Sequence, residues 1–226
     1  MFFLLLTLAA CRAEPQTGQF PDAGRDVAPI VTQSFSTEDV RDRTGEAEEV
    51  MRLAEVAPGM SVADVGAGEG YYTVRLAPIV GRQGRVLAQD IVRETRDKLA
   101  QRVQRERLDN VAVMLGTPAN PMLPAQSFDR IFLVHMYHEV DKPYEFLWNL
   151  RQSLKPDGLV IVVDSDRPVK RHGMPVRQLM CEFAALGMRP VRTTRLTRSE
   201  AYFAAFRIDA ARPRPSDIEP CKAAKA

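Results

Sequence analysis

The sequence has little of what usually marks a metal centre, a disulfide-stabilised scaffold or a membrane span. It contains three histidines and three cysteines in 226 residues, and no two cysteines have the CxxC spacing of zinc and redox motifs. The apolar run at its start covers eleven residues, far short of the ~20 that a transmembrane helix needs. These absences predict neither a zinc-binding module nor a transmembrane helix.

An excess of charge is also missing. The chain has 31 basic and 29 acidic side chains, for a formal net charge of +2, so composition gives no reason to expect a nucleic-acid partner. Basic residues do gather between 93 and 107, but acidic residues are interleaved with them. This pattern is typical of a solvated helix face.

The N-terminal segment MFFLLLTLAAC is typical of the apolar core of a signal peptide. Its end, Leu8-Ala9-Ala10-Cys11, resembles the lipobox of bacterial lipoproteins. That resemblance implies a signal peptide over 1–10, a lipid on Cys11, and a periplasm-facing protein attached to the cell envelope. The alternative is an unprocessed N-terminus and a cytoplasmic protein. Residues 11–35 are polar and rich in proline, and we expect a tether that need not fold.

The remaining two cysteines predict no site. Cys181 lies in a helical pattern, and Cys221 lies in the segment 211–226, which we expect to be a disordered tail. A Cys181–Cys221 disulfide would be possible in an oxidising compartment. We expect instead one thiol in the core and one in the tail.

The segment between the tether and the tail alternates short β-branched runs with amphipathic stretches of helical length. The predicted strands are 62–65, 85–89, 111–115, 130–134 and 159–163, followed by a pair at 189–195 and 201–208 that we expect to form a hairpin at the sheet edge. The predicted helices are 36–56, 70–80, 94–107, 142–153 and 176–186. This alternation predicts one α/β domain over 36–210, with a doubly wound, seven-stranded, mostly parallel sheet, helices on both faces and an antiparallel last strand.

Three glycines follow the first predicted strand in the stretch Asp64-Val-Gly66-Ala-Gly68-Glu-Gly70. A glycine loop between a strand and a helix allows backbone N–H groups to approach a ligand closely. A dinucleotide fingerprint would need another glycine at position 71, where the sequence has Tyr71. Asp90, at the tip of the second strand, is in the position of a carboxylate that holds two ribose hydroxyls.

These residues resemble those of the class I S-adenosylmethionine-dependent methyltransferases. The acidic-x-Gly-x-Gly-x-Gly motif matches Asp64 to Gly70, and Asp90 matches the ribose carboxylate. Further matches are Ser127-Phe128-Asp129 before the fourth strand, the Leu154-Lys155-Pro156-x-Gly158 turn, Tyr137-His138, and Arg171-His172-Gly173-Met174-Pro175. The resemblance covers residues 45–208 and implies S-adenosylmethionine as the cofactor and a small-molecule acceptor.

The resemblance also implies cofactor contacts from Tyr72, Ile91 and His135. Many members of the family place an aspartate after the third strand to contact the adenine amino group. This chain has no carboxylate there, and we assign that contact to the side-chain amide of Asn120, with a backbone group as the alternative. Tyr72 could equally pack into the core, and His135 could cap backbone groups at the turn after the fourth strand.

His138 is the candidate general base, because an imidazole can take up a proton near neutral pH. The alternative is a capping role at the same turn. His172, after the fifth strand, could reach the substrate mouth, but we expect it only to contact solvent.

The sequence thus predicts methyl transfer to a small or medium-sized molecule. The first alternative is a non-catalytic, envelope-anchored ligand-binding protein with the same fold. A nicotinamide-dependent oxidoreductase is disfavoured by the glycine spacing.

Overall fold

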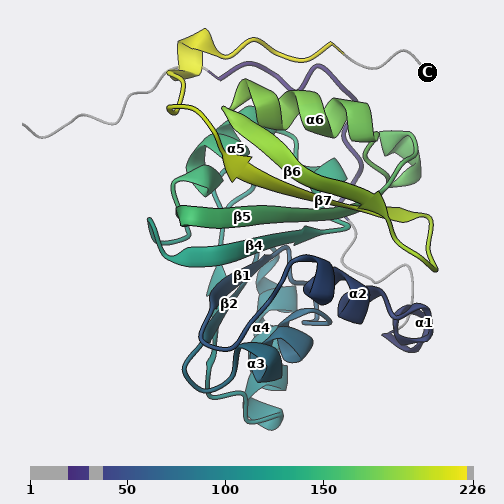
Figure 1. Cartoon of the computed structure of the whole chain (residues 1–226), viewed down its shortest axis with the longest axis vertical. Helices are drawn as coiled ribbons and strands as arrows, with labels where there is room; N and C mark the ends of the chain where they lie inside the picture. Colours follow the sequence, from purple (N-terminus) through teal and green to yellow (C-terminus); the bar gives the residue numbers. More distant parts are fainter. Residues whose placement is uncertain (1–19, 31–37, 223–226) are drawn as a thin grey trace, which may run out of the picture.

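Seven strands form a single sheet in the computed structural model, which describes residues 20–30 and 38–222 (Figure 1). The sheet order is β3-β2-β1-β4-β5-β7-β6. The strands are β1 Ser61–Val65, β2 Arg85–Asp90, β3 Val111–Leu115, β4 Phe128–Val134, β5 Leu154–Ser165, β6 Met188–Arg195 and β7 Ala201–Ile208. Strands β1 to β5 pair in parallel, and β7 is antiparallel to both β5 and β6. The predicted fold class and edge hairpin are confirmed.

Six α-helices surround the sheet in the described part of the chain. They are α1 Glu38–Thr44, α2 Glu46–Leu53, α3 Thr73–Val80, α4 Arg93–Arg105, α5 Pro143–Arg151 and α6 Val176–Ala185. Three short 3-10 helices, η1 Tyr137–Glu139, η2 Val169–Arg171 and η3 Pro215–Asp217, lie in the connections. No helix among residues 20–30 and 38–222 is long and apolar enough to cross a membrane.

The sheet separates two apolar cores because successive side chains of a strand point to opposite faces. On one face, Ala63 and Val65 of β1 belong to a core with buried residues of α5 and α6. On the other face, Val62 packs in a core with residues of α2 and α3. The alternating β-branched residues therefore create a sheet covered on both sides, with its strand ends left for a site.

Two boundaries differ from those predicted. The helix expected over 36–56 is broken at Gly45, whose φ of 67° lies in the left-handed region and separates α1 from α2. The turn at Lys155–Gly158, expected before the fifth strand, lies inside β5, which begins at Leu154. A register shift between Phe128 and Arg130 accommodates the extra residues.

The expected tether is partly structured. The predictions for residues 1–10 and Cys11 lie outside the described residues. Within 20–30, however, Arg25 forms a buried ion pair of 2.7 Å with Glu182 of α6. The Ala28 N–H also donates to the His138 carbonyl at 3.1 Å. A buried arginine is stable only with a charged partner. The Arg25–Glu182 pair therefore holds residues 20–30 against α6.

The expected disordered tail is wrong for residues 211–222. A disulfide joins Cys221 to Cys181 of α6, and the Cys221 N–H donates to the Tyr144 hydroxyl. The expectation of two separate thiols is therefore also wrong. Figure 1 shows the N-terminal segment in purple and the C-terminal segment in yellow, both running past α6.

Candidate functional site

The glycine loop lies directly after β1, and each glycine in it has a different structural role. All three have positive φ, at 69°, 57° and 91° for Gly66, Gly68 and Gly70. A Cβ on Gly66 would lie 2.9 Å from Met136 Cγ, and one on Gly70 would lie 2.5 Å from Leu99 Cδ1. A Cβ on Gly68 would meet no atom within 4 Å. Gly66 and Gly70 thus allow close packing, whereas Gly68 presents its backbone to an open space.

Asp90 at the end of β2 holds the loop in place. Its Oδ2 accepts a hydrogen bond from the Gly68 N–H at 3.0 Å, and its Oδ1 accepts one from the Val92 N–H at 2.9 Å. Each carboxylate oxygen has a further lone pair. The carboxylate can therefore accept ligand hydroxyls beside the loop that it orients.

A cavity of about 400 Å³ opens at the carboxyl ends of β1, β2 and β4. This is where open α/β sheets bind ligands, and the volume is in the range of small-molecule sites. Of the predicted cofactor residues, Gly66, Gly68, Asp90, Ile91 and His135 line the cavity. Most of its other walls are apolar.

Asp64 does not line the cavity. Its side chain is buried under the loop and accepts a 2.6 Å hydrogen bond from the Thr73 hydroxyl at the start of α3. Burial raises the pKa of the Asp64 carboxyl to about 6, although the bond from Thr73 acts in the opposite direction. Asp64 therefore shapes the loop by anchoring the helix that follows it.

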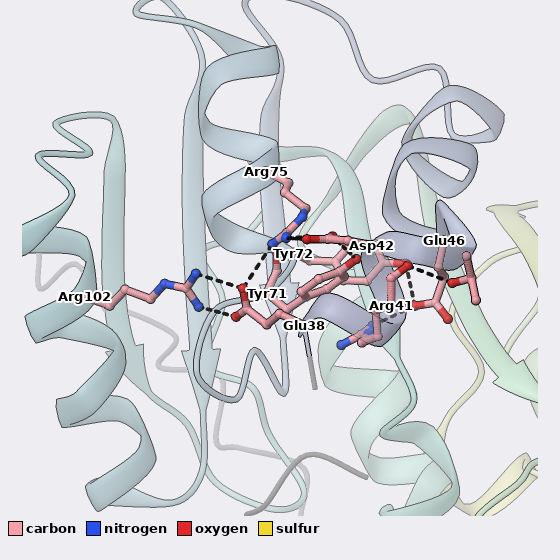
Figure 2. A network of polar contacts seen from close by, with 9 residues as sticks. Glu38, Arg41, Asp42, Glu46, Tyr71, Tyr72, Arg75 and Arg102 are labelled. Carbon is pink, nitrogen blue, oxygen red and sulfur yellow. Dashed lines mark hydrogen bonds and ion pairs between the residues drawn. The ribbon is translucent and has the colours of Figure 1, made fainter. Parts of the chain in front are cut away.

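Tyr72 also lies outside the cavity wall. Its hydroxyl donates to Glu46 Oε1 at 3.1 Å, and the same carboxylate accepts a hydrogen bond from Arg41 at 2.7 Å. Figure 2 shows the polar network between α1, α2, α3 and α4 to which these contacts belong, with Glu38, Arg41, Asp42, Glu46, Tyr71, Tyr72, Arg75 and Arg102 labelled. The prediction that Tyr72 contacts the cofactor is not supported, because α2 supplies a buried acceptor for its hydroxyl.

His135 connects this network to the cavity. Its Nε2 lies 3.0 Å from Glu46 Oε2, so the ring pairs with a carboxylate instead of capping backbone groups as the alternative prediction held. Burial raises the pKa of Glu46, but the hydrogen bond and charge of His135 and the charge of Arg41 outweigh it and lower the pKa to about 2. Glu46 is thus an anion that fixes one wall of the cavity.

Asn120 is the predicted site residue that the structure supports least. Its Oδ1 accepts the Met122 N–H at 2.7 Å within its own turn, and Asn120 is not among the residues that line the cavity. Asparagine side chains commonly bond the backbone two residues further on. The local turn therefore uses the group that we had assigned to adenine.

His138 lies on η1, behind the cavity wall. Its ring is 3% exposed, and its Nδ1 lies 2.8 Å and 3.1 Å from the two oxygens of Asp164 at the end of β5. His138 does not line the cavity, whereas its neighbour Glu139 does. The expectation that His172 only contacts solvent is wrong, since its ring lies edge-on to that of His138 with centroids 5.6 Å apart.

Sequence reasoning missed Gln89, the residue before Asp90. Its side chain lines the cavity and is 1% exposed, and its Nε2 has no hydrogen-bond partner among the described residues. An ideal Cβ on Gly116, after β3, would lie 1.8 Å from this nitrogen. A buried amide donor without a partner is unusual. Gln89 therefore places an unpaired amide donor beside Gly116. A polar residue in an apolar strand was the available signal.

The segment 27–30 also lines the cavity and was missed. Its polar, proline-containing surroundings gave no sign of packing. Ala28, at 3% exposure, belongs to the core beneath α5 and α6. The site thus has one wall from the N-terminal segment as well as walls from the strand ends.

Part of this chain is similar to known proteins. Residues 63–162 match the protein family described as "Methyltransferase domain". A demethylmenaquinone methyltransferase of Bacillus cereus is 27% identical over 121 residues, which is 54% of this chain and 51% of that protein. The chain therefore spans about half the length of this curated relative.

Solved structures share the fold. A methyltransferase of Aquifex aeolicus, described as dependent on S-adenosylmethionine, superposes with a TM-score of 0.68 at 23% identity, over 77% of this chain and all of that one. A geranyl diphosphate C-methyltransferase of Streptomyces coelicolor, in complex with Mg²⁺, geranyl diphosphate and S-adenosyl-L-homocysteine, gives 0.61 at 15% identity, over 75% of this chain and 81% of that one. The architecture is thus the Rossmann-like methyltransferase fold.

Proposed function

We propose that this protein, whose residues 63–162 carry a methyltransferase domain, transfers a methyl group from S-adenosylmethionine to a small or medium-sized molecule. The observation that carries the proposal is the Gly68–Asp90 pair at the mouth of the cavity. S-adenosylmethionine supplies an electrophilic methyl group when bound. The protein's own task is to position the acceptor and remove any proton it carries.

The residues present fit this cofactor. Asp90 has acceptor capacity for ribose hydroxyls, Gly68 gives a ligand close access to the backbone, and Gln89 holds an amide donor in the buried part of the cavity. A nicotinamide dinucleotide fits less well, because residue 71 is a buried tyrosine where the fingerprint requires glycine.

Gly68→Val tests the assignment. Its Cβ would meet no atom, but valine at a φ of 57° strains the backbone, so the variant should block or displace the loop while the rest of the domain folds. Gly59→Val is the matched control, since Gly59 also has positive φ and no atom within 4 Å of its Cβ but does not line the cavity. The proposal expects calorimetric titration to show cofactor binding by the control and loss of binding by Gly68→Val. Equal affinity in the two variants would refute the loop assignment.

The lining of the cavity indicates the chemical class of the methyl acceptor. Apolar residues line most of the cavity, including Ile30, Met136, Val140 and Phe146. These side chains favour an acceptor with an apolar body. A screen of apolar hydroxyl, thiol and activated-carbon compounds with radiolabelled cofactor would identify it, and a protein that binds cofactor without any turnover would favour the non-catalytic alternative.

His138 remains our candidate general base for this reaction. Asp164 contacts Nδ1, which assigns the proton of the neutral ring to Nδ1 and leaves the Nε2 lone pair to accept a proton. The role requires a path from Nε2 to the acceptor, because the ring lies behind the wall that Glu139 forms.

The envelope location is likewise a proposal. The Leu8-Ala9-Ala10-Cys11 sequence supports lipidation, and the Cys181–Cys221 disulfide supports an oxidising compartment. Cell fractionation and intact mass of the protein from its native host test both. A soluble cytoplasmic chain that retains Met1 and reduced cysteines would refute the proposal.

A further inference from the structure

Two histidines and a glutamate lie close together, and of the three only the glutamate lines the cavity. His138 and Glu139 belong to η1 after β4, and His172 follows η2 after β5. One potential ligand atom from each residue can be chosen such that all three lie within 4.8 Å of one another. Segments more than thirty residues apart in sequence thus bring together three groups that commonly bind metals.

Asp164 orients the first of these ligands. Both its oxygens lie within 3.1 Å of His138 Nδ1, and both residues are buried, with side chains 3% and 0% exposed. A histidine whose one nitrogen bonds a carboxylate directs the other nitrogen toward an electrophile. This carboxylate–histidine arrangement is what metal sites use to fix the tautomer and raise ligand basicity.

The backbone holds His172 in place over His138. His172 has φ 52° and ψ 61°, a left-handed conformation uncommon for residues other than glycine. Its carbonyl accepts hydrogen bonds from the Arg167 guanidinium at 3.1 and 3.2 Å. A Cβ on the next residue, Gly173, would lie 2.7 Å from the Ser165 carbonyl oxygen. The turn therefore requires glycine at position 173, because a side chain there would collide with the Ser165 carbonyl.

We infer that His138, Glu139 and His172 bind one divalent transition-metal ion, with Asp164 as the outer partner of His138. Two imidazoles and one carboxylate form a ligand set of zinc and non-haem iron sites. Ligands at 2.0–2.1 Å from a tetrahedral ion lie about 3.3 Å apart, so the side chains need to close by at most about 1.5 Å. His172 and Glu139 are only partly buried and can make that adjustment by side-chain rotation.

The position of the ion follows from its ligands. Glu139 lines the cavity, so the ion would lie at the cavity wall, and three protein ligands leave coordination positions for water or an acceptor oxygen. Nε2 of His138 has one lone pair, so in the metal-bound protein His138 is a ligand and not a base. Binding of an acceptor oxygen by the ion rests on the proposed function, whereas binding of the ion by the three residues does not.

The experiment is a titration of the chelator-treated full chain with Co²⁺, in which the visible ligand-field absorption of bound Co²⁺ reports binding. Zn²⁺ is then added as a competitor. We expect one site per chain. His172→Asn, which tolerates the left-handed backbone, and Glu139→Gln should each weaken binding by more than about 100-fold, beyond the 10- to 100-fold expected for the outer partner in Asp164→Asn. Glu106→Gln is the matched control for Glu139→Gln and should bind as the parent does, because Glu106 is exposed at the C-terminal end of α4, outside both the cluster and the cavity lining.

Melting temperatures establish that each variant is folded, and the metal should raise the melting temperature most in the parent and in Glu106→Gln. No binding by the parent, or parent-like binding by folded His172→Asn and Glu139→Gln, would overturn the inference. Titration of the metal-free protein with S-adenosylmethionine separates this result from the proposed function. If the parent protein binds Co²⁺ but does not bind S-adenosylmethionine, the proposed function is refuted and the metal site is not.

Discussion

Gln89→Met should weaken cofactor binding without lowering the stability of the ligand-free protein. The Gln89 amide is 1% exposed, its Nε2 has no partner among the described residues, and its Oε1 accepts only a long 3.4 Å hydrogen bond from the Gly66 N–H. Methionine has a similar length and no polar hydrogen. The substitution therefore removes an unpaired donor at the cost of one weak bond.

The magnitudes follow from those contacts. An unsatisfied buried polar group costs about 1–3 kcal/mol, and a typical hydrogen bond contributes about 0.5–1.5 kcal/mol. The free energy of unfolding without ligand should therefore stay unchanged or rise by about 1 kcal/mol in Gln89→Met. If Nε2 donates to the bound cofactor, affinity should fall by about 1–3 kcal/mol, or roughly 5- to 150-fold.

Denaturant unfolding and calorimetric titration measure the two quantities. Gln101→Met is the control, since Gln101 is exposed on α4 and should change neither. Gly116→Ala tests the same nitrogen without changing Gln89. The added Cβ would displace the Gln89 amide, so this variant should also bind the cofactor more weakly. A Gln89→Met protein that is less stable and binds S-adenosylmethionine as tightly as the parent would refute a ligand-directed role for the amide.

Four further predictions address other parts of the chain. Asp90→Ala should weaken cofactor binding by about 1.5–3 kcal/mol, the scale of hydrogen bonds to a charged group, and unchanged affinity in a titration would move the ribose elsewhere. His138→Ala, assayed after chelation, should lower kcat by about 10²–10⁴-fold with little change in cofactor affinity, and unchanged turnover would reduce the residue to a structural one. Reducing the Cys181–Cys221 bond, which spans 40 residues, should lower the free energy of unfolding by about 4 kcal/mol, and denaturant curves with and without reductant that coincide would contradict this. The pKa of Glu46 is about 2 in the folded protein against an ordinary value of 4.5. Its ionised form should therefore add about 3 kcal/mol to the free energy of unfolding above pH 4.5, and this part is lost as the pH falls toward 2. Denaturant unfolding measured across this pH range should show that Glu46→Gln lacks this part of the acid-induced loss of stability.

The sheet could be predicted from the sequence because its information is local. β-branched runs, glycine loops and amphipathic stretches recur at the spacing of βαβ units, and these fixed the strands, their parallel pairing and the edge hairpin. The glycine loop and Asp90 could be placed for the same reason, since both follow directly from the ends of predicted strands.

The rest depends on contacts between segments distant in sequence. Tyr72 faces Glu46 of α2 and not the cavity, and Cys221 reaches Cys181 across 40 residues. Arg25 is held by Glu182, 157 residues away. Composition correctly described residues 11–35 as polar and rich in proline, but it could not reveal that Arg25 has a buried partner elsewhere in the chain. His172 was misjudged because its position depends on the turn at Gly173.

Calorimetric titration of the purified protein with S-adenosylmethionine, in parallel with NAD, tests the central claim most directly. The Gly68–Asp90 geometry and the residue at position 71 predict one S-adenosylmethionine site per chain and no binding of NAD. Binding of NAD without binding of S-adenosylmethionine, or binding of neither by folded protein, would contradict the account.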